Sequence, residues 1–109
     1  MKRLVVILLV QFVFTATAMA GGNPVAGKEK SQACVACHGE TGMSAAPTFP
    51  NIAGQYEDYL YISLQGYKSG ERKNAIMSGI VAALNDQDMK DLAAYYASQK
   101  GLYSLGLPE

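Results

Sequence analysis

The residues with the most distinctive chemistry are the two cysteines and the one histidine of the chain, which lie together in the run Cys34-Val35-Ala36-Cys37-His38. A C-x-x-C-H run is the attachment signature of c-type haem. The two-residue gap lets both sulfurs reach one edge of a porphyrin, and the imidazole that follows can then reach the iron. The pattern therefore predicts one haem, bound covalently through Cys34 and Cys37, with His38 as an iron ligand.

Three other chemistries compete for the same residues. A thioredoxin-type redox pair would follow a strand in a βαβ pattern, and the sequence has no such pattern. A structural disulfide leaves His38 unexplained and closes too short a loop to stabilise the fold much. A zinc site needs four ligands, so carboxylates at no recognisable spacing would have to complete it. Covalent haem explains all three residues, and we favour it.

A haem that only carries electrons needs a second axial ligand, and the one His is already used. A methionine sulfur is the natural candidate. Met19 lies in a leader that we expect to be removed, Met43 is close to His38 in sequence, and Met89 lies on a predicted helix with core-like spacing. Met77 lies in a polar, glycine-flanked stretch that we predict to be a loop returning over the ring. We therefore predict that Met77 is the sixth ligand and that a cavity lies beside His38 and Met77.

The first twenty residues have the three parts of a secretory signal peptide. Lys2 and Arg3 form a basic start, residues 4–14 are almost wholly apolar, and Ala18-Met19-Ala20 is a small-x-small cleavage site. An uncleaved anchor is the alternative, but a spanning helix needs about 20 apolar residues. We predict a signal peptide over 1–20 and one domain over 21–109. The domain is then periplasmic, with no membrane span after cleavage.

The chain is short, and its charges balance. With 109 residues it holds one domain at most, and its nine basic and nine acidic side chains argue against a nucleic-acid binder held by a basic face. From Gly21 onward, acidic side chains outnumber basic ones by two. A domain of this size buries a small core, so a covalent cofactor would add needed stability.

The remaining sequence predicts an all-α domain of four or five short helices. Asn23-Pro24 opens the first helix and Asn85 caps the last, while a glycine- and proline-rich loop follows the cysteines. The segments are a helix near 25–34, a loop over 39–50, a helix over 56–67 with a stop near Gly66 or Gly70, an apolar segment over 79–84, and a last helix from 86 to about 100 that ends at Gly101.

These residues resemble the class I c-type cytochromes of the small bacterial monohaem kind. The chain is also similar to one half of the dihaem periplasmic cytochromes of the c-four subgroup. The resemblance rests on 34–39, 49–55, 70–74 leading to Met77, 84–89 and 92–97. It implies the cytochrome c fold, with short helices around one haem and crossing N- and C-terminal helices. It also implies His38 and Met77 as axial ligands.

The same resemblance implies roles for residues around the haem. The carbonyl of Pro50 would accept the other ring N–H of His38 and orient the imidazole. Asn74 would hydrogen-bond near the Met77 sulfur, and Arg72 would meet a haem propionate; ordinary solvation in a loop is the alternative for both residues. Three tyrosines would form walls of the haem pocket: Tyr59, Tyr67 and Tyr96.

The function predicted from the sequence is that of a soluble periplasmic one-electron carrier with a low-spin His/Met haem c, and not an enzyme. Its partners would be redox proteins that give and accept the electron at the haem edge near Cys34 and Cys37. The chain would be a monomer or a weak dimer. Two alternatives remain: a haem subunit dedicated to one periplasmic dehydrogenase or reductase, and an open-site haem enzyme, which requires that Met77 not bind the iron.

Overall fold

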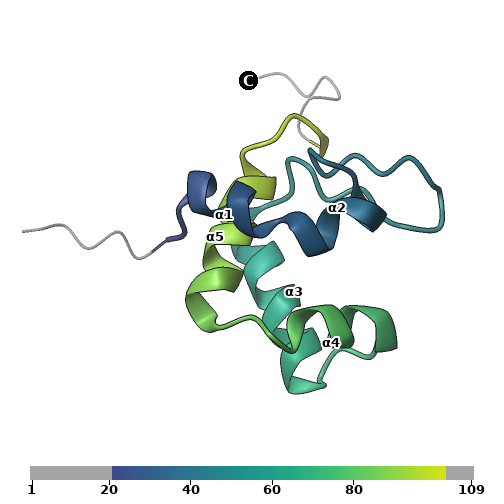
Figure 1. The fold of residues 1–109 in the computed structure, drawn as a ribbon, viewed down its shortest axis with the longest axis vertical. Coiled ribbons are helices and arrows are strands. Elements are labelled where there is room, and N and C mark those ends of the chain that lie inside the picture. Colours follow the sequence, from purple (N-terminus) through teal and green to yellow (C-terminus); the bar gives the residue numbers. More distant parts are fainter. Residues whose placement is uncertain (1–20, 103–109) are drawn as a thin grey trace, which may run out of the picture.

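The computed structural model describes residues 21–102, and it forms that part of the chain from helices without strands (Figure 1). This confirms the all-helical prediction. The predicted signal peptide over 1–20 and the tail over 103–109 lie outside the described residues. None of the helices within 21–102 has the length and apolar character of a membrane-crossing segment. The helices are α1 (Pro24–Lys30), α2 (Gln32–His38), α3 (Glu57–Ser69), α4 (Ala75–Val81) and α5 (Asp86–Ala97).

The first helical segment is two helices rather than one, so the prediction of a single helix over 25–34 was wrong. Asn23 caps α1 as expected, because its side-chain oxygen accepts the backbone N–H groups of Val25 and Ala26. At Ser31 the hydroxyl donates to the carbonyl oxygen of Lys28 across 2.7 Å, and the helix ends. Such local side-chain bonds compete with helix continuation. Helix α2 begins one residue later.

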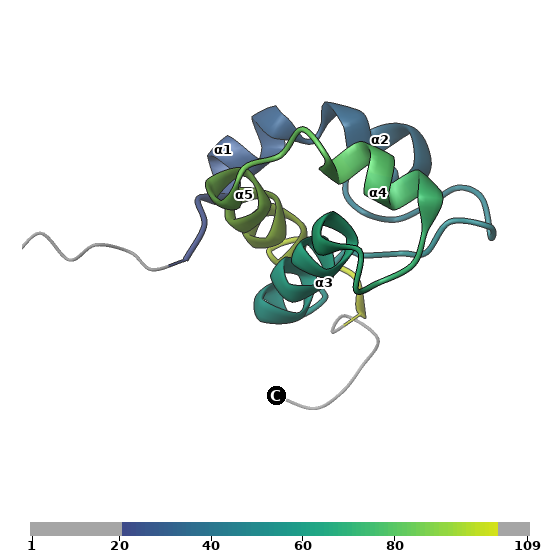
Figure 2. The ribbon, with the colours of Figure 1, turned by 90° about the horizontal axis from the view of Figure 1, so that it is seen from below.

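The N- and C-terminal helices α1 and α5 cross, as the resemblance implied, and make the most extensive helix contact (Figures 1 and 2). The crossing depends on Gly27, because a Cβ there would lie 1.9 Å from the backbone oxygen of Asp91. Lys30 adds polar contacts, since its ammonium lies 2.6 Å from Asp91 and 2.9 Å from Asp88. These contacts hold the start of the chain against α5.

Helix α5 begins as predicted and ends earlier than predicted. Asn85 and Asp88 form a reciprocal capping box at its start. The helix ends at Ala97 and not near residue 100, because the chain then turns toward Ala53, whose carbonyl accepts the N–H of Leu102 across 2.9 Å. A Cβ on Gly101 would lie 2.0 Å from that carbonyl oxygen. Gly101 is therefore needed because the chain passes close to Ala53 there, and it does not terminate α5.

Helices α3 and α4 form the other side of the molecule, with α3 packed against both α5 and α4 (Figure 2). Helix α3 ends at Gly70, one of the two predicted stops, where φ is 84°. The loop predicted around Met77 is wrong, because residues 75–81 form α4. The buried core between the helices contains Leu92, Tyr95 and Tyr96.

Candidate functional site

A cavity of about 480 Å³ lies among α2, α3, α4, α5 and the loop that follows α2. Its lining includes Cys34, Cys37, His38 and Met77, so the predicted cavity beside His38 and Met77 is present. The volume lies within the range of pockets that hold small ligands and cofactors. The structure therefore brings together side chains that are far apart in the sequence.

Helix α2 presents both cysteines to this cavity. Cys34 and Cys37 are three residues apart, which places them on the same face of the helix. Both are free thiols, and each is half-buried. Burial raises the pKa of the Cys34 thiol. The two sulfurs are thus neighbours in a mainly apolar wall.

His38 is the last residue of α2, and its side chain is buried, with 8 % of the residue exposed. The ring Nδ1 lies 2.8 Å from the carbonyl oxygen of Pro50. A carbonyl oxygen only accepts hydrogen bonds, so Nδ1 carries the proton and donates. The lone pair of the neutral ring is then on Nε2, which is the nitrogen free to bind a metal.

Met77 lies in the first turn of α4 and is half-buried in the cavity lining. The side-chain oxygen of Asn74 accepts the backbone N–H of Met77 across 3.0 Å and caps the helix, a role that the sequence did not predict. The other two methionines within residues 21–102 lie elsewhere. Met43 is 50 % exposed and outside the cavity lining, and Met89 is 4 % exposed in the core, as predicted.

Among the described residues that line the cavity, Arg72 is the one Arg, Lys, Asp or Glu. Its guanidinium donates to the hydroxyls of Tyr59 (3.3 Å) and Ser63 (3.1 Å). It also lies 5.0 Å from the ring centre of Tyr67 and 5.9 Å from that of Tyr59. Among residues 21–102 no carboxylate forms an ion pair with it. The positive charge is therefore held in place and left without a compensating anion.

The sequence did not single out Ser63 as part of this arrangement. Tyr59, Ser63 and Tyr67 are spaced four residues apart, which puts them on one face of α3. That spacing was a usable signal, because the three side chains surround one guanidinium. The predicted tyrosine walls are present, since Tyr59, Tyr67 and Tyr96 all line the cavity.

The buried hydroxyl of Tyr96 makes no hydrogen bond within the described part of the chain. Burial raises the pKa of this hydroxyl, and the nearby Cys34 adds to the effect. The ring of Tyr96 lines the cavity together with Cys34, so it forms part of the wall on that side.

The donor set fits haem and does not fit zinc. Two thiols, one imidazole with a free Nε2 and one thioether share an otherwise mainly apolar cavity. Within residues 21–102, no three His, Cys, Asp or Glu side chains are arranged so that together they could hold a metal ion, although Cys34, Cys37 and His38 share the cavity. The fold and this cavity therefore define a small all-helical protein with a covalently attached haem.

Comparison with known proteins identifies the family. Residues 24–100 match the family model for cytochrome c. The chain belongs to the cytochrome c family, whose members bind haem c covalently.

Three known proteins illustrate the similarity. Cytochrome c4 of Pseudomonas aeruginosa is 46 % identical over 100 residues, which cover 92 % of this chain and 50 % of the relative. The crystal structure of reduced cytochrome c4 from Pseudomonas stutzeri aligns with a TM-score of 0.70 at 46 % identity, over 73 % of this chain and 47 % of that one. The thiosulfate dehydrogenase electron acceptor of Thiomonas intermedia is 34 % identical over 101 residues, 92 % of this chain and 45 % of that protein. The chain thus spans about half the length of these relatives.

Proposed function

We propose that this protein is a periplasmic one-electron carrier, with a haem c attached to Cys34 and Cys37 and ligated by His38 and Met77. The observation that carries the proposal is the shared cavity of the two thiols, the imidazole and the thioether. When bound, the haem supplies an iron that takes up and releases one electron. The side chains of the protein would hold the haem, orient its ligands and exclude water from it.

His38 is held ready to act as a ligand before it binds iron. The hydrogen bond from Nδ1 to the Pro50 carbonyl fixes both the tautomer and the ring plane, because the donor and acceptor are 2.8 Å apart. A second hydrogen bond of this kind is typical of histidines that bind metals, because it holds the ring in the orientation that the ligand needs. Pro50 is thus a positioning residue for His38.

Met77 and the apolar walls favour the reduced state. A thioether sulfur is a soft ligand that prefers the lower oxidation state, so it raises the potential. Apolar side chains such as Ile80, Leu64 and Leu92 also line the cavity. An apolar lining disfavours the oxidised state, because that state carries one more positive charge. If His38 and Met77 both hold the iron, they would leave it no position for a substrate, as a carrier requires.

Arg72 supports a particular orientation of the cofactor. The cysteines lie on α2, whereas the exposed Arg72 lines the cavity beside the α3 residues Tyr59 and Tyr67. An unpaired guanidinium is a good partner for a carboxylate. We expect that Arg72 would hold a propionate of a haem attached to Cys34 and Cys37.

Export rests on the predicted signal peptide. Thioether attachment of haem takes place on the outer side of the membrane, which matches an exported chain. Cleavage after Ala20 would leave a chain that begins at Gly21. Mass spectrometry of the periplasmic fraction tests this, because an intact leader would give a mass larger by residues 1–20.

A second candidate is an electron-accepting subunit for one particular dehydrogenase. The similarity to the thiosulfate dehydrogenase electron acceptor over 92 % of this chain favours it. Electron transfer to one bound enzyme and electron transfer to several diffusing partners would use the same haem cavity, so the cavity does not distinguish the two functions. Co-purification at native ionic strength separates them: a stoichiometric dehydrogenase supports the subunit, and a free chain supports the diffusing carrier.

The main experiment is a redox titration of the purified holoprotein with absorption spectra at each potential. We expect one reversible one-electron step, a low-spin spectrum in both states, and a pyridine haemochrome that shows one haem per chain. A colourless protein would exclude haem. A high-spin spectrum would instead favour an open-site haem enzyme.

A further inference from the structure

The start of the domain is held between two helices that come much later in the chain. The backbone N–H of Gly22 donates to Oε1 of Glu57, the first residue of α3, across 3.3 Å. The backbone N–H of Asn23 donates to Oδ1 of Asp91 on α5 across 2.8 Å. A Cβ on Gly22 would lie only 1.9 Å from the backbone oxygen of Lys90. The path of the chain between α3 and α5 is therefore fixed before α1 begins.

Gly21 lies beside the same carboxylate of Glu57. A Cβ built on Gly21 would lie 3.3 Å from Oε1 of Glu57. The nitrogen on the same Cα is about 2.5 Å from that Cβ, so it lies within about 6 Å of the carboxylate oxygen. At this separation an ammonium and a carboxylate attract each other, and each favours the charged form of the other. The attraction exists only if the nitrogen of Gly21 is an ammonium and not an amide.

Removal of the leader changes the charge of this nitrogen. In the precursor it is an uncharged amide bonded to Ala20. Hydrolysis of that bond by a signal peptidase consumes one water and leaves a carboxylate on Ala20. The amine of Gly21 takes up the proton that the new carboxyl group releases, because its ordinary pKa is about 8. Cleavage after Ala20 would therefore place a positive charge beside Glu57 where there was none.

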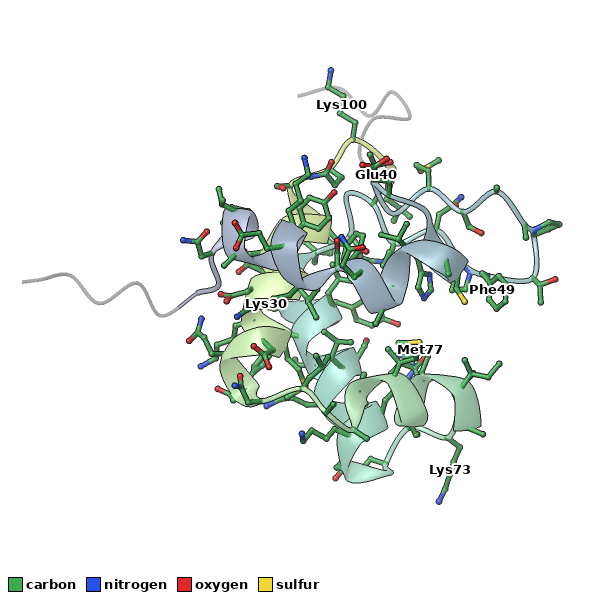
Figure 3. All side chains as sticks on the ribbon, in the orientation of Figure 1. Lys30, Glu40, Phe49, Lys73, Met77 and Lys100 are labelled. Atoms are coloured by element: carbon green, nitrogen blue, oxygen red, sulfur yellow. The ribbon has the colours of Figure 1, made fainter. Side chains whose placement is uncertain are left out.

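The other charged groups near this segment already have partners. Asp91 is paired across 2.6 Å with Lys30, whose side chain extends from α1 toward α5 (Figure 3). The ammonium of Lys90 lies 2.9 Å from Asp86. Among residues 21–102 no Lys or Arg forms an ion pair with Glu57. Glu57 is thus the carboxylate that has a position for a new cation.

We propose that removal of the leader creates an ion pair between the new amino-terminal ammonium of Gly21 and the carboxylate of Glu57. This rests on the proposed cleavage after Ala20. Helix α1 packs against α5, and α3 packs against the same helix and lines the haem cavity. The ion pair would link the start of the mature chain directly to α3. The mature holoprotein is then more stable than one whose amino-terminal amine carries no charge.

The test compares holoprotein that begins at Gly21 with the same holoprotein acetylated at this amine alone, each with and without Glu57→Gln. The glutamine keeps an oxygen for the N–H of Gly22 and removes only the charge. At low ionic strength, Glu57→Gln should lower Tm by about 2–4 °C when the amine is free and by less than about 1 °C when it is acetylated. High salt should remove this difference. Equal losses in the free and acetylated proteins would overturn the proposal.

Asp58→Asn is the matched control. Asp58 is an exposed carboxylate in the same first turn of α3, so it interacts with the helix dipole much as Glu57 does. Its replacement should leave the Tm of both the free-amine and the acetylated holoprotein nearly unchanged. If acetylation altered the effect of Asp58→Asn as strongly as that of Glu57→Gln, the attraction would be general and the proposed pair would be refuted.

A second readout does not depend on unfolding. NMR of holoprotein made with carbon-13 glycine follows the ionisation of the Gly21 amine as the pH rises. The pKa of this amine should lie above its ordinary value of about 8, because the carboxylate favours the charged form. In Glu57→Gln the pKa should return toward that value. The same pKa in both proteins would contradict the ion pair.

These results separate the inference from the proposals on which it rests. A mature chain whose first residue is not Gly21 would defeat the proposed cleavage, and this inference with it. A mature chain that begins at Gly21, but shows equal Tm losses and the same amine pKa with and without the Glu57 carboxylate, defeats this inference alone. The redox titration tests the haem and its ligands independently of both.

Discussion

The side-chain oxygen of Asn74 accepts the backbone N–H of Met77 across 3.0 Å, so the residue that caps α4 also fixes the turn that carries the proposed ligand. Loss of such a cap costs about 1 kcal/mol. If that cost falls on the closed form, the equilibrium in which the first turn of α4 opens and Met77 leaves the iron shifts by roughly fivefold. Asn74→Ala should therefore speed the binding of imidazole to the oxidised protein by about fivefold. Asn74→Asp keeps the acceptor and should bind imidazole at the original rate. Equal rates in all three proteins would contradict the link between cap and ligand.

Met77→Ala should lower the midpoint potential and open the iron to added ligands. The physical reason is the loss of a soft sulfur ligand that favours the reduced state. The measurement is the redox titration, together with binding of cyanide or imidazole to the oxidised form. Met43→Ala is the matched control, because Met43 is exposed and outside the cavity lining. An unchanged midpoint in Met77→Ala would transfer the ligand assignment to Met43 or Met89.

Replacing both Cys34 and Cys37 with Ser should leave a poorly folded chain. Without a covalent group, the mainly apolar walls of a cavity of about 480 Å³ face water in a domain with a small core. Circular dichroism should show a broad thermal transition at a much lower temperature than that of the holoprotein. Ala36→Ser, on an exposed position of the same helix, keeps both thiols and should melt as the unmodified holoprotein does. A sharp, cooperative transition of the double variant would refute this expectation.

The parts of the site that the sequence predicted are those set by local spacing. The cysteines and His38 are neighbours in the chain, so one helical turn presents them together. Capping at Asn23 and Asn85 is equally local, and both caps are present. The core position of Met89 followed from helical periodicity on α5. None of these predictions needed knowledge of the tertiary structure.

The parts that the sequence missed are decided by single side-chain hydrogen bonds and by contacts between distant segments. The stretch around Met77 reads as a polar loop, but a single cap at Asn74 and packing against α3 make it helical. The break at Ser31 depends on one hydroxyl bond to Lys28. The last helix stops at Ala97 because the chain then meets Ala53. The helix propensities of the residues alone do not predict where these helices begin and end.

Asp91 should make the stability depend on pH in the acid range. Its burial favours the neutral form, but hydrogen bonds from the Asn23 N–H, Lys30 and Gln87 outweigh this, and its pKa falls to about 2. A carboxyl whose pKa is lower in the folded state than in the unfolded state stabilises the fold at pH values above its unfolded-state pKa of about 4. That stabilisation is lost as the pH falls from about 4 toward 2.

The corresponding variant is Asp91→Asn, followed by thermal melting across this pH range. It should melt several degrees below the unmodified protein at neutral pH, and the gap should narrow as the pH falls from about 4 to 2. Asp58→Asn removes an exposed carboxylate on α3 and should leave the melting profile unchanged. A gap for Asp91→Asn that stays constant down to pH of about 2 would show that its ionisation does not stabilise the fold.

Gly27→Ala should weaken the crossing of the terminal helices more than any other single methyl addition on α1. The new Cβ would lie 1.9 Å from the backbone oxygen of Asp91 and 2.7 Å from Cβ of Tyr95, so α1 and α5 must move apart. Overpacking of this kind costs about 1–3 kcal/mol, and each kcal/mol lowers Tm by about 4–8 °C in a small domain. Gly79→Ala on α4 is the control, since its Cβ meets nothing within 4 Å and alanine favours the helix. Its Tm should stay level or rise slightly, and equal losses in the two variants would mean that close approach at Gly27 does not set the crossing.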